Sequence, residues 1–467
     1  MFQRVSPAPS PAPAFVLFND RLANDLGLGA PELNSAEGLS YFSGSTLPKD
    51  AQPFAQAYAG HQFANFTMLG DGRAVMLGEH RTPNGDLFDI QLKGGGQTPY
   101  SRRGDGKAAL GPMLREYIIS EAMHALAIPT TRSLAVVSTG EVIYRENVLE
   151  GAILTRVAKS HIRVGTFEYV AASQDTATLK TFTDYTLQRH DPSLADREDK
   201  YLAFFQHVMD RQAFLIAQWM LVGFIHGVMN TDNMAISGET IDYGPCAFMN
   251  RYDPATVFSS IDRQGRYAFG NQPSIAQWNL TRLAEALLPL FHTDQSTAIE
   301  LAKDQLQRFP TLYQTYWLSG MRRKLGLLKE EAQDAHLIDS FLRCLAAVRS
   351  DYTNALRSLC DERMPTPKML LGSAPWSEWK ASWEKRLAQE NRPVEDSKLD
   401  MQTYNPFIIP RNHLVEAALR SATVEKDFSV THKLLKALED PFSGAVEKMA
   451  FTMPSENDET YQTFCGT

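Results

Sequence analysis

Alternating hydrophobic and polar residues predict that the N-terminal part of the chain is rich in β-strands. We predict strands over residues 66–80 and 87–93, and the TPNGD segment between them contains the Asn-Gly pair that favours a tight hairpin turn. Residues 87–93 alternate with a period of two, so that one face is apolar and the other carries Asp89, Gln91 and Lys93. Lys93 is therefore expected to point away from the apolar side of its strand.

Helical periodicity becomes dominant further along the chain. A helix is predicted over residues 112–126, with one proline in its first turn and another just beyond its end. A second pair of strands is expected over 133–145 and 151–158, followed by a long helix over about 199–224. After about residue 275 the pattern is that of amphipathic helices separated by loops. This succession predicts an α+β fold.

Composition and charge narrow the classes of function. The chain has 467 residues and a net charge of −8, without a block of lysines and arginines, which argues against a nucleic-acid surface. Its four cysteines form no C-x-x-C motif, so we expect neither a disulfide framework nor a zinc site, and a reducing cytoplasm is the default location. No apolar run is long enough to span a membrane. Residues 7–13 are rich in proline and are expected to form an arm that lies on the surface or hangs loose.

One short motif, HGVMNTDN at residues 226–233, is similar to the catalytic loop of protein kinases. In the kinase pattern H-R-D-x-x-x-x-N, the aspartate accepts the substrate's hydroxyl proton and the asparagine holds a metal ion. His226 and Asn233 keep this spacing, but Val228 stands where the aspartate belongs, and a carboxylate appears instead at Asp232. The chain is therefore an inactive relative of kinases, or it performs different chemistry with similar parts.

A lysine on a strand and a glutamate on the next helix form a second kinase-like feature. Lys93 and Glu116 are 23 positions apart, as expected for the ion pair that holds a lysine against nucleotide phosphates. The alternative is that both are ordinary solvated charges.

The segment IDYGP contains Asp242 in a setting like the kinase D-F-G, whose aspartate binds magnesium. Asn233 and Asp242 are thus candidate metal ligands, and Mg²⁺ suits a site with only one or two protein oxygens. The alternative for the short motif is ordinary loop and capping chemistry.

Two glycine-rich loops lie close to Lys93 in the sequence, LGDGRA at 69–74 and KGGGQTPYSRRGDGKAAL at 93–110. Glycine allows backbone N–H groups to approach phosphates, and arginines such as Arg156 and Arg163 could supply charge. Neither loop has the G-x-x-x-x-G-K-[ST] pattern of a P-loop. Flexible connections and surface arginines are the alternatives.

Together these motifs resemble the selenoprotein O family. The resemblance rests on LGDGR, QLKGGGQTPYSRRGDGKA, LREYIISEAMH, HGVMNTDNM and IDYGP, and on YAGHQF, NQPSIAQWNLTRLAEAL and NPFIIPRNHL elsewhere, so that it covers nearly the whole chain. It implies a protein-kinase-like bilobal fold in which ATP is bound in a flipped orientation. It also implies that AMP, not phosphate, is transferred to Ser, Thr or Tyr hydroxyls of proteins.

The resemblance assigns roles to individual residues. It implies that Asp232 is the proton acceptor, that Glu116 orients Lys93, and that Asn233 and Asp242 hold Mg²⁺, with Mn²⁺ as the alternative ion. It further implies that ATP is bound by Gly70, Gly72, Arg73, Lys93, Asp105, Gly106, Arg156, Arg163 and Asp242.

The resemblance also divides the chain. It implies a Pro-rich arm over 1–13, a nucleotide-binding N-lobe over 14–157, a C-lobe over 158–275 and a helical extension over 276–467. The expected partners are ATP and protein substrates. These substrates are expected to include redox-related proteins and the chain itself.

The C-terminal TFCGT departs from those family members that carry selenocysteine at the third residue from the end. Cys465 stands at that position and could pair with Cys246 in response to oxidation, or remain a free thiol. Two other functions stay open at this point, a phosphotransferase that uses Asp232 as its base and an inactive ATP-binding scaffold.

Overall fold

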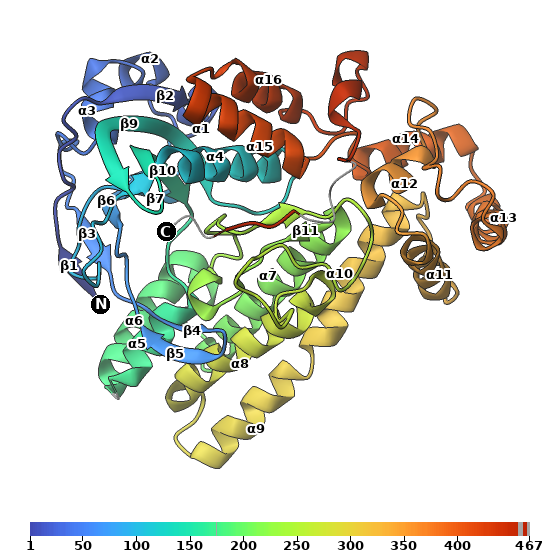
Figure 1. Cartoon of the computed structure of the whole chain (residues 1–467). Coiled ribbons are helices and arrows are strands. Elements are labelled where there is room, and N and C mark those ends of the chain that lie inside the picture. Colours follow the sequence, from blue (N-terminus) through green and yellow to red (C-terminus); the bar gives the residue numbers. More distant parts are fainter. Residues whose placement is uncertain (174, 456–460, 465–467) are drawn as a thin grey trace.

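An antiparallel sheet organises the N-terminal part of the chain (Figure 1). The computed structural model describes residues 1–173, 175–455 and 461–464. Its main sheet has eight strands in the order β1-β3-β6-β7-β10-β9-β2, with β8 paired to β10, and neighbouring strands run antiparallel. These strands are β1 (Phe2–Arg4), β2 (Ala14–Phe18), β3 (Phe54–Gln56), β6 (Ala74–Arg81), β7 (Leu87–Lys93), β8 (Ala108–Ala109), β9 (Arg132–Tyr144) and β10 (Val148–Ala158). Two small sheets pair β4 (Ala59–Gln62) with β5 (Asn65–Met68) and β11 (Phe224–Ile225) with β12 (Ala247–Phe248).

Helices cover both faces of the main sheet. Helix α4 (Leu110–Ala125) packs on β9 and β10, and its buried side chains share a core with Val136. The next residue of β9, Val137, points to the opposite face, where it joins a second core with α1 (Asp20–Asp25) and α3 (Ala36–Phe42). The short helix α2 (Ala30–Leu33) lies between those two helices in the chain.

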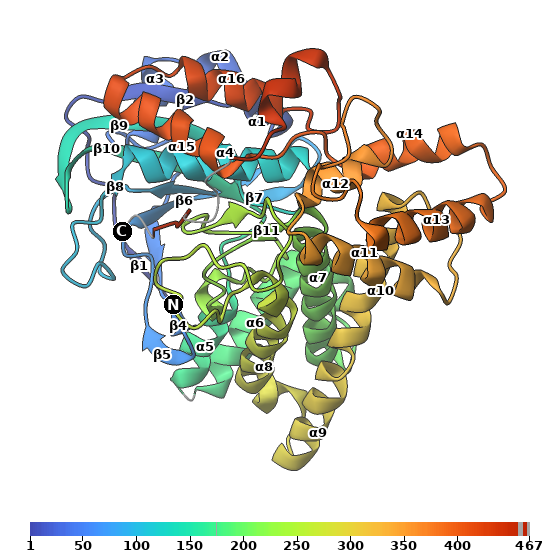
Figure 2. The same cartoon turned by 45° about the vertical axis from the view of Figure 1, so that its right-hand side comes forward.

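The rest of the chain is mainly helical. One continuous core joins α4 to the long helix α7 and to α8, and α15 and α16 return to pack on α4 (Figures 1 and 2). Helix α7 ends at Gly223, whose φ of +74° suits glycine at a helix terminus. These helices are α5 (Val164–Ala172), α6 (Thr176–His190), α7 (Lys200–Val222), α8 (Gln272–Phe291), α9 (Gln295–Leu306), α10 (Phe309–Lys324), α11 (Asp334–Ala347), α12 (Tyr352–Ser358), α13 (Ala374–Ala388), α14 (Val394–Tyr404), α15 (Asn412–Arg420) and α16 (Ser429–Leu438).

Most predicted elements are present, and one is divided. The helix expected over 112–126 is α4, and the pattern at 133–145 gives β9. The strand pattern over 66–80 is interrupted, because β5 ends at Met68 and β6 begins at Ala74. The LGDGR turn between them is the reason, since glycines at a turn end a strand.

The proline-rich arm lies on the surface of the sheet region, the first of the two arrangements expected for it. Its backbone N–H groups at Val5, Ala8 and Ala12 donate to carbonyl groups of Pro53, Gly95 and Thr139. The first residues of the arm also add β1 to the edge of the main sheet.

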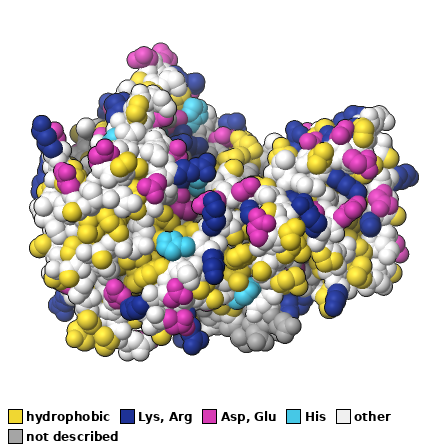
Figure 3. Space-filling view, turned by 90° about the horizontal axis from the view of Figure 1, so that it is seen from above, with side chains coloured by type: hydrophobic (Ala, Val, Ile, Leu, Met, Phe, Trp, Pro, Cys, Tyr) yellow, Lys and Arg dark blue, Asp and Glu magenta, His cyan; other side chains and the backbone are white. Residues whose placement is uncertain are grey.

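Acidic and basic side chains are interspersed on the face seen from above (Figure 3), in keeping with the absence of a basic block in the sequence. Within the described part of the chain, no helix combines the length and the apolar character that crossing a membrane requires.

Candidate active site

A buried network of charges joins the sheet to α4. The Nζ of Lys93, at the end of β7, lies 2.6 Å from Oε2 of Glu116 on α4. The guanidinium of Arg156, on β10, donates to Oε1 of the same glutamate at 2.8 and 2.5 Å. All three side chains are less than a tenth exposed. Lys93 and Glu116 are thus in contact, and they share Arg156 as a further partner.

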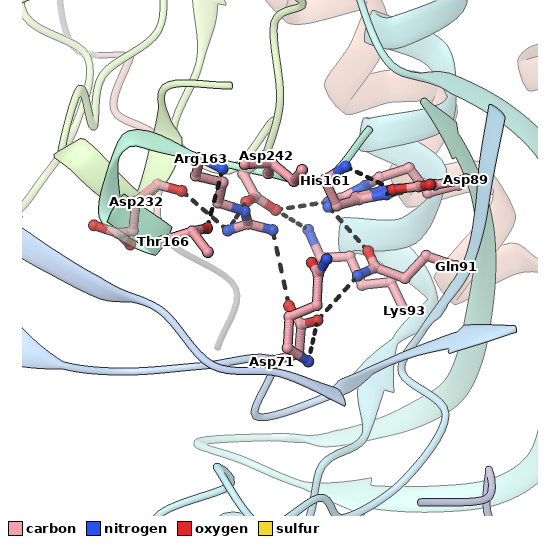
Figure 4. Close-up of polar contacts among 12 residues, drawn as sticks. Asp71, Asp89, Gln91, Lys93, His161, Arg163, Thr166, Asp232 and Asp242 are labelled. Carbon is pink, nitrogen blue, oxygen red and sulfur yellow. Dashed lines mark hydrogen bonds and ion pairs between the residues drawn. The ribbon is translucent and has the colours of Figure 1, made fainter. Parts of the chain in front are cut away.

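The carboxylate of Asp242 completes this network. Its Oδ1 accepts hydrogen bonds from Lys93 at 2.9 Å and from Arg156 at 2.6 Å, and its Oδ2 lies 3.2 Å from Arg163 (Figure 4). Burial by itself raises the pKa of Asp242, but Arg156, Lys93 and Arg163 outweigh it and hold the pKa well below its usual range. The backbone of Asp242 has a φ of +63°, an uncommon conformation for a residue other than glycine. The site therefore keeps an ionised carboxylate among three cations.

A second acidic group, Asp71, faces Arg163 from the LGDGR turn (Figure 4). Its Oδ2 accepts hydrogen bonds from the backbone N–H of Gln56 at 3.1 Å and from the amide of Gln91 at 3.3 Å. Burial raises the pKa of Asp71 to about 6, against the opposing effect of Arg163. Arg163 also lies over the ring of Tyr58, with its Cζ 4.5 Å from the ring centroid.

Asp232 also lies next to Arg163, in a short 3₁₀ turn at Thr231–Asn233. Arg163 donates to the backbone carbonyl of Asp232 at 3.0 Å, and the Oδ1 of Asp232 is buried without a hydrogen-bond partner among the described residues. Burial raises the pKa of this carboxyl to about 6, with Arg163 acting in the opposite direction. A carboxylate with a raised pKa close to neutrality is suited to accept a proton.

The other kinase-like positions of this motif, His226, Val228 and Asn233, make contacts that differ from one residue to the next. His226 is fully buried and its Nε2 contacts the carbonyl of Ile241 at 2.9 Å, so it connects the two motif loops. Val228 is buried, and its carbonyl accepts a hydrogen bond from Nδ2 of Asn233 at 2.9 Å. The apolar side chain of Val228 therefore cannot act as a base, and the amide oxygen of Asn233 is left for other contacts.

The glycine-rich loops are tied to each other. The hydroxyl of Thr98 donates to the carbonyl of Asp71 and that of Ser101 donates to the carbonyl of Gly72, each at 2.6 Å. Gly106 has a φ of +69°, and a Cβ at this position would come within 2.1 Å of the carbonyl oxygen of Gly96. This crossing therefore requires glycine.

Not every predicted nucleotide ligand lies in the charged network. Asp105 is at the rim, with a side chain 40% exposed, and pairs with Arg145 at 2.8 Å. Gly70 packs against the ring of Tyr100, and the carbonyl of Arg73 accepts a hydrogen bond from the backbone N–H of Gly94. Their roles in binding ATP stay predictions.

The proposed disulfide concerns a residue outside the described part of the chain, Cys465. Its suggested partner, Cys246, is fully buried, and burial raises the pKa of its thiol to about 12. A thiol in this setting is poorly reactive.

Several buried polar residues of the site were not predicted. Asp71 was inside a motif that had been recognised for its glycines, and Gln91 shares the polar face of its strand with Lys93. Asp89, on the same face, accepts a hydrogen bond from the backbone N–H of His161 at 2.8 Å and pairs with Arg189 at 2.7 Å. The alternation along β7 contained this signal, since Asp89 and Gln91 share the polar face of the strand with the candidate ligand Lys93.

A cavity of about 940 Å³ adjoins the charged network but is distinct from it. Leu77, Ile90 and Phe182 line it, together with Gln56 and Thr166, which contact Asp71 and Arg163. None of the five network residues, Lys93, Glu116, Arg156, Arg163 and Asp242, contributes to its lining. The candidate site is therefore defined by its buried charges.

The donor set fits a magnesium ion in its chemistry. Asn233 and Asp242 offer an amide oxygen and a carboxylate, the oxygen ligands that Mg²⁺ takes when phosphates and waters supply the rest. Within the described residues, no group of three or more His, Cys, Asp and Glu side chains is arranged to hold a metal, so a dedicated protein cage is not found there.

Known proteins similar in sequence to this chain match it over its whole length. Residues 1–439 match a family described as protein adenylyltransferase SelO. The chain is 56% identical over 467 residues to a protein nucleotidyltransferase YdiU of Brevibacillus brevis, covering 100% of this chain and 95% of the relative. A protein of the same description from Halalkalibacterium halodurans is 56% identical over 470 residues, with the same coverage. The predicted family and the predicted enzyme class are confirmed: the chain belongs to the SelO/YdiU family of protein adenylyltransferases and is a nucleotidyltransferase.

Proposed function

We propose that the chain transfers AMP from ATP to Ser, Thr or Tyr hydroxyls of proteins, with ATP bound in a flipped orientation relative to kinases. The observation that carries this proposal is the position of Asp232 next to a cluster of buried cations. Three buried cations converge on Asp242 at 2.6 to 3.2 Å, and Nη1 of Arg163, one of the three, also donates to the backbone carbonyl of the candidate base, Asp232, at 3.0 Å. A triphosphate whose terminal phosphates enter the cationic end has its α-phosphorus nearer to Asp232.

The same parts support a protein-kinase-like arrangement. The sheet region over 14–157 corresponds to an N-lobe, 158–275 to a C-lobe, 276–467 to a helical extension and 1–13 to the arm. The contact of Lys93 with Glu116 is the ion pair that kinases place between their sheet and the following helix.

In the proposed reaction the acceptor's hydroxyl oxygen attacks the α-phosphorus. The bond between this phosphorus and the bridging oxygen breaks, and pyrophosphate leaves with the electron pair. Asp232 takes the hydroxyl proton, for which its pKa of about 6 is suitable at neutral pH. Lys93, Arg156 and Arg163 stabilise the charge that develops on the departing pyrophosphate.

Asn233 and Asp242 would hold Mg²⁺ or Mn²⁺, which when bound supplies positive charge to the phosphate oxygens. The buried cations of the protein hold the phosphates in place before the reaction, so that few groups need to move in the transition state.

The test uses two labels. Purified protein is incubated with Mg²⁺ and either α-³²P-ATP or γ-³²P-ATP, and label is sought on the chain itself and on added proteins. Label from the α-position alone, lost in Asp242→Ala and after EDTA, supports the proposal. Label from the γ-position alone identifies a kinase, and no label with ATP still bound identifies a scaffold.

A further inference from the structure

The β4–β5 hairpin leaves the main sheet and contacts the helical region. It is inserted between β3 and β6, which pair with each other at Phe54 and Met76. Both views show it beside α5, outside the main sheet (Figures 1 and 2), and β4 contacts both α5 and the turn that contains Asp232. A segment of the sheet region therefore crosses to the loop that carries the candidate base.

Two backbone N–H groups of the hairpin bind the residues directly before Asp232. The N–H of His61 donates to Oγ1 of Thr231 at 2.7 Å, and the N–H of Phe63 donates to Oδ1 of Asn230 at 3.2 Å. Oδ1 of Asn230 also accepts a hydrogen bond from the hydroxyl of Tyr267 at 2.5 Å. The hairpin thus fixes the loop by its backbone.

A buried carboxylate on α5 fixes the hairpin in turn. Nδ1 of His61 donates to Oε1 of Glu168, whose side chain is 4% exposed, while that of His61 is 18% exposed. Burial raises the pKa of Glu168, and the Thr231 hydroxyl and His61 oppose this effect. The ring of His61 also packs edge-on against Trp278 of α8, with centroids 5.3 Å apart.

Two glycines allow this close packing. A Cβ at Gly60 would lie 2.3 Å from Oδ1 of Asp232, and one at Gly165 would lie 1.9 Å from the carbonyl oxygen of Ala59. Neither glycine has a positive φ, so both are required for space and not for backbone conformation. The backbone of β4 therefore covers one oxygen of Asp232, the one that has no hydrogen-bond partner among the described residues.

We propose that His61 and Glu168 are positioning residues for AMP transfer. They hold the β4–β5 hairpin on residues 230–232, so that only one oxygen of Asp232 is open to the acceptor hydroxyl and its direction is fixed. This inference rests on the proposed function, because it assigns Asp232 the role of proton acceptor. Moving a reacting group such as the Asp232 carboxylate by about 1 Å lowers the rate roughly a hundredfold. A hairpin that holds this carboxylate in place should therefore affect the rate of transfer.

The experiment compares His61→Ala and His61→Asn with the wild type. Asparagine places its Nδ2 close to the position of the imidazole Nδ1 and can still donate to Glu168. His80→Ala is the matched control, because His80 is another half-buried histidine of the sheet region, and its Nε2 contacts the carbonyl of Leu26. For each protein we would measure the kcat and the KM for ATP with α-³²P-ATP and dephosphorylated casein, the melting temperature, and amide hydrogen exchange over residues 59–68.

We expect His61→Ala to lower kcat roughly tenfold to a hundredfold, with the KM for ATP and the melting temperature close to those of the wild type. His61→Asn should recover most of the rate, and His80→Ala should keep it. Faster exchange over 59–68 in His61→Ala alone would show that the hairpin has detached. A wild-type kcat in His61→Ala, an equal loss in His80→Ala, or a loss explained by melting temperature overturns the inference.

Failure of the proposed function has a different signature. If the wild type transfers no α-label, the proposed function is wrong. Amide hydrogen exchange over residues 59–68 still shows, in that case, whether His61 holds the hairpin in place. An active wild type with an undisturbed hairpin in His61→Ala overturns the inference and leaves the proposed function standing.

Discussion

Replacing Asp242 with asparagine tests whether the three buried cations form a phosphate site. Asparagine keeps the size of the side chain and tolerates the φ of +63° better than most residues, so the change chiefly removes the negative charge. Lys93 and Arg156 then retain Glu116 as a partner, and Arg163 retains Asp71 at 3.9 Å. The cluster becomes more positive by one unit.

The expected loss in the free energy of unfolding of Asp242→Asn follows from the burial of these groups. Removal of one partner from a buried ion pair costs about 3–5 kcal/mol, because the other charge is left uncompensated. The side chain of Asp242 is 22% exposed, so we expect the lower end, about 3 kcal/mol of the free energy of unfolding. The pKa of Asp242 is lowered in the folded state, so this stabilisation is present at neutral pH and disappears as pH falls through that lowered pKa.

A phosphate anion should restore what the carboxylate supplied. Urea unfolding is measured with and without inorganic tripolyphosphate, in EDTA, so that no metal contributes. An anion at 100 times its Kd stabilises the folded state by about 2.7 kcal/mol. We expect a larger gain in Asp242→Asn than in the wild type, because the native carboxylate competes with phosphate for the same cations.

Asp361→Asn is the matched control. Asp361 is more deeply buried than Asp242, with a side chain 2% exposed, and pairs with Arg357 at 2.7 Å, but it lies in the helical region and belongs to no candidate site. It should lose at least as much free energy of unfolding and gain no more from tripolyphosphate than the wild type does. Equal rescue of both variants, or no extra rescue of Asp242→Asn, would refute a phosphate site at these cations.

Three further changes have definite expected outcomes. Asp232→Asn should lower the rate of AMP transfer roughly 10²–10⁴-fold with ATP binding retained, as judged by α-label incorporation and calorimetric titration. Gly106→Ala should weaken ATP binding in the same titration, because the new Cβ would approach the Gly96 carbonyl to 2.1 Å. Burial raises the pKa of Glu239 to about 7, so the free energy of unfolding of the wild type should fall as pH rises from about 4.5 through 7. Glu239→Gln should remove that decline and be more stable than the wild type by about 1–3 kcal/mol in urea unfolding at pH 8. If the variant kept the pH dependence of the wild type, Glu239 would not be the group responsible for it.

The sequence predicted the elements of this fold better than their boundaries or contacts. Alternation and helical periodicity are local properties, so β7 and α4 were recognisable within a few residues. The division between β5 and β6 depended on a turn whose glycines were visible but whose effect on pairing was not. The return of α15 and α16 to α4 is a contact between distant segments, which no local pattern encodes.

For the site, contacts within a recognised motif were predictable and contacts that depend on packing were not. Lys93, Glu116 and Asp242 could be named because their types and spacing match kinase motifs, and the structure brings them into contact. His61 and Glu168 could not be paired, because 107 positions separate them and neither spacing nor periodicity relates a hairpin to a distant helix. The close approach of Gly60 to Asp232 is likewise a property of three-dimensional packing.

The valine at the kinase aspartate position can now be related to the charges around it. In the described network, Lys93, Arg156 and Arg163 face two carboxylates with lowered pKa values, Glu116 and Asp242, and burial raises the pKa of the third, Asp71, to about 6. The three converging cations favour the most highly charged part of ATP, its terminal phosphates, and on the proposed function the α-phosphorus then lies toward the loop at 230–232. A base on the loop is needed where the acceptor hydroxyl meets that phosphorus, so a carboxylate at position 232 is useful and one at 228 is not. Val228 is free to be apolar because its backbone carbonyl, not its side chain, makes the contact that orients Asn233.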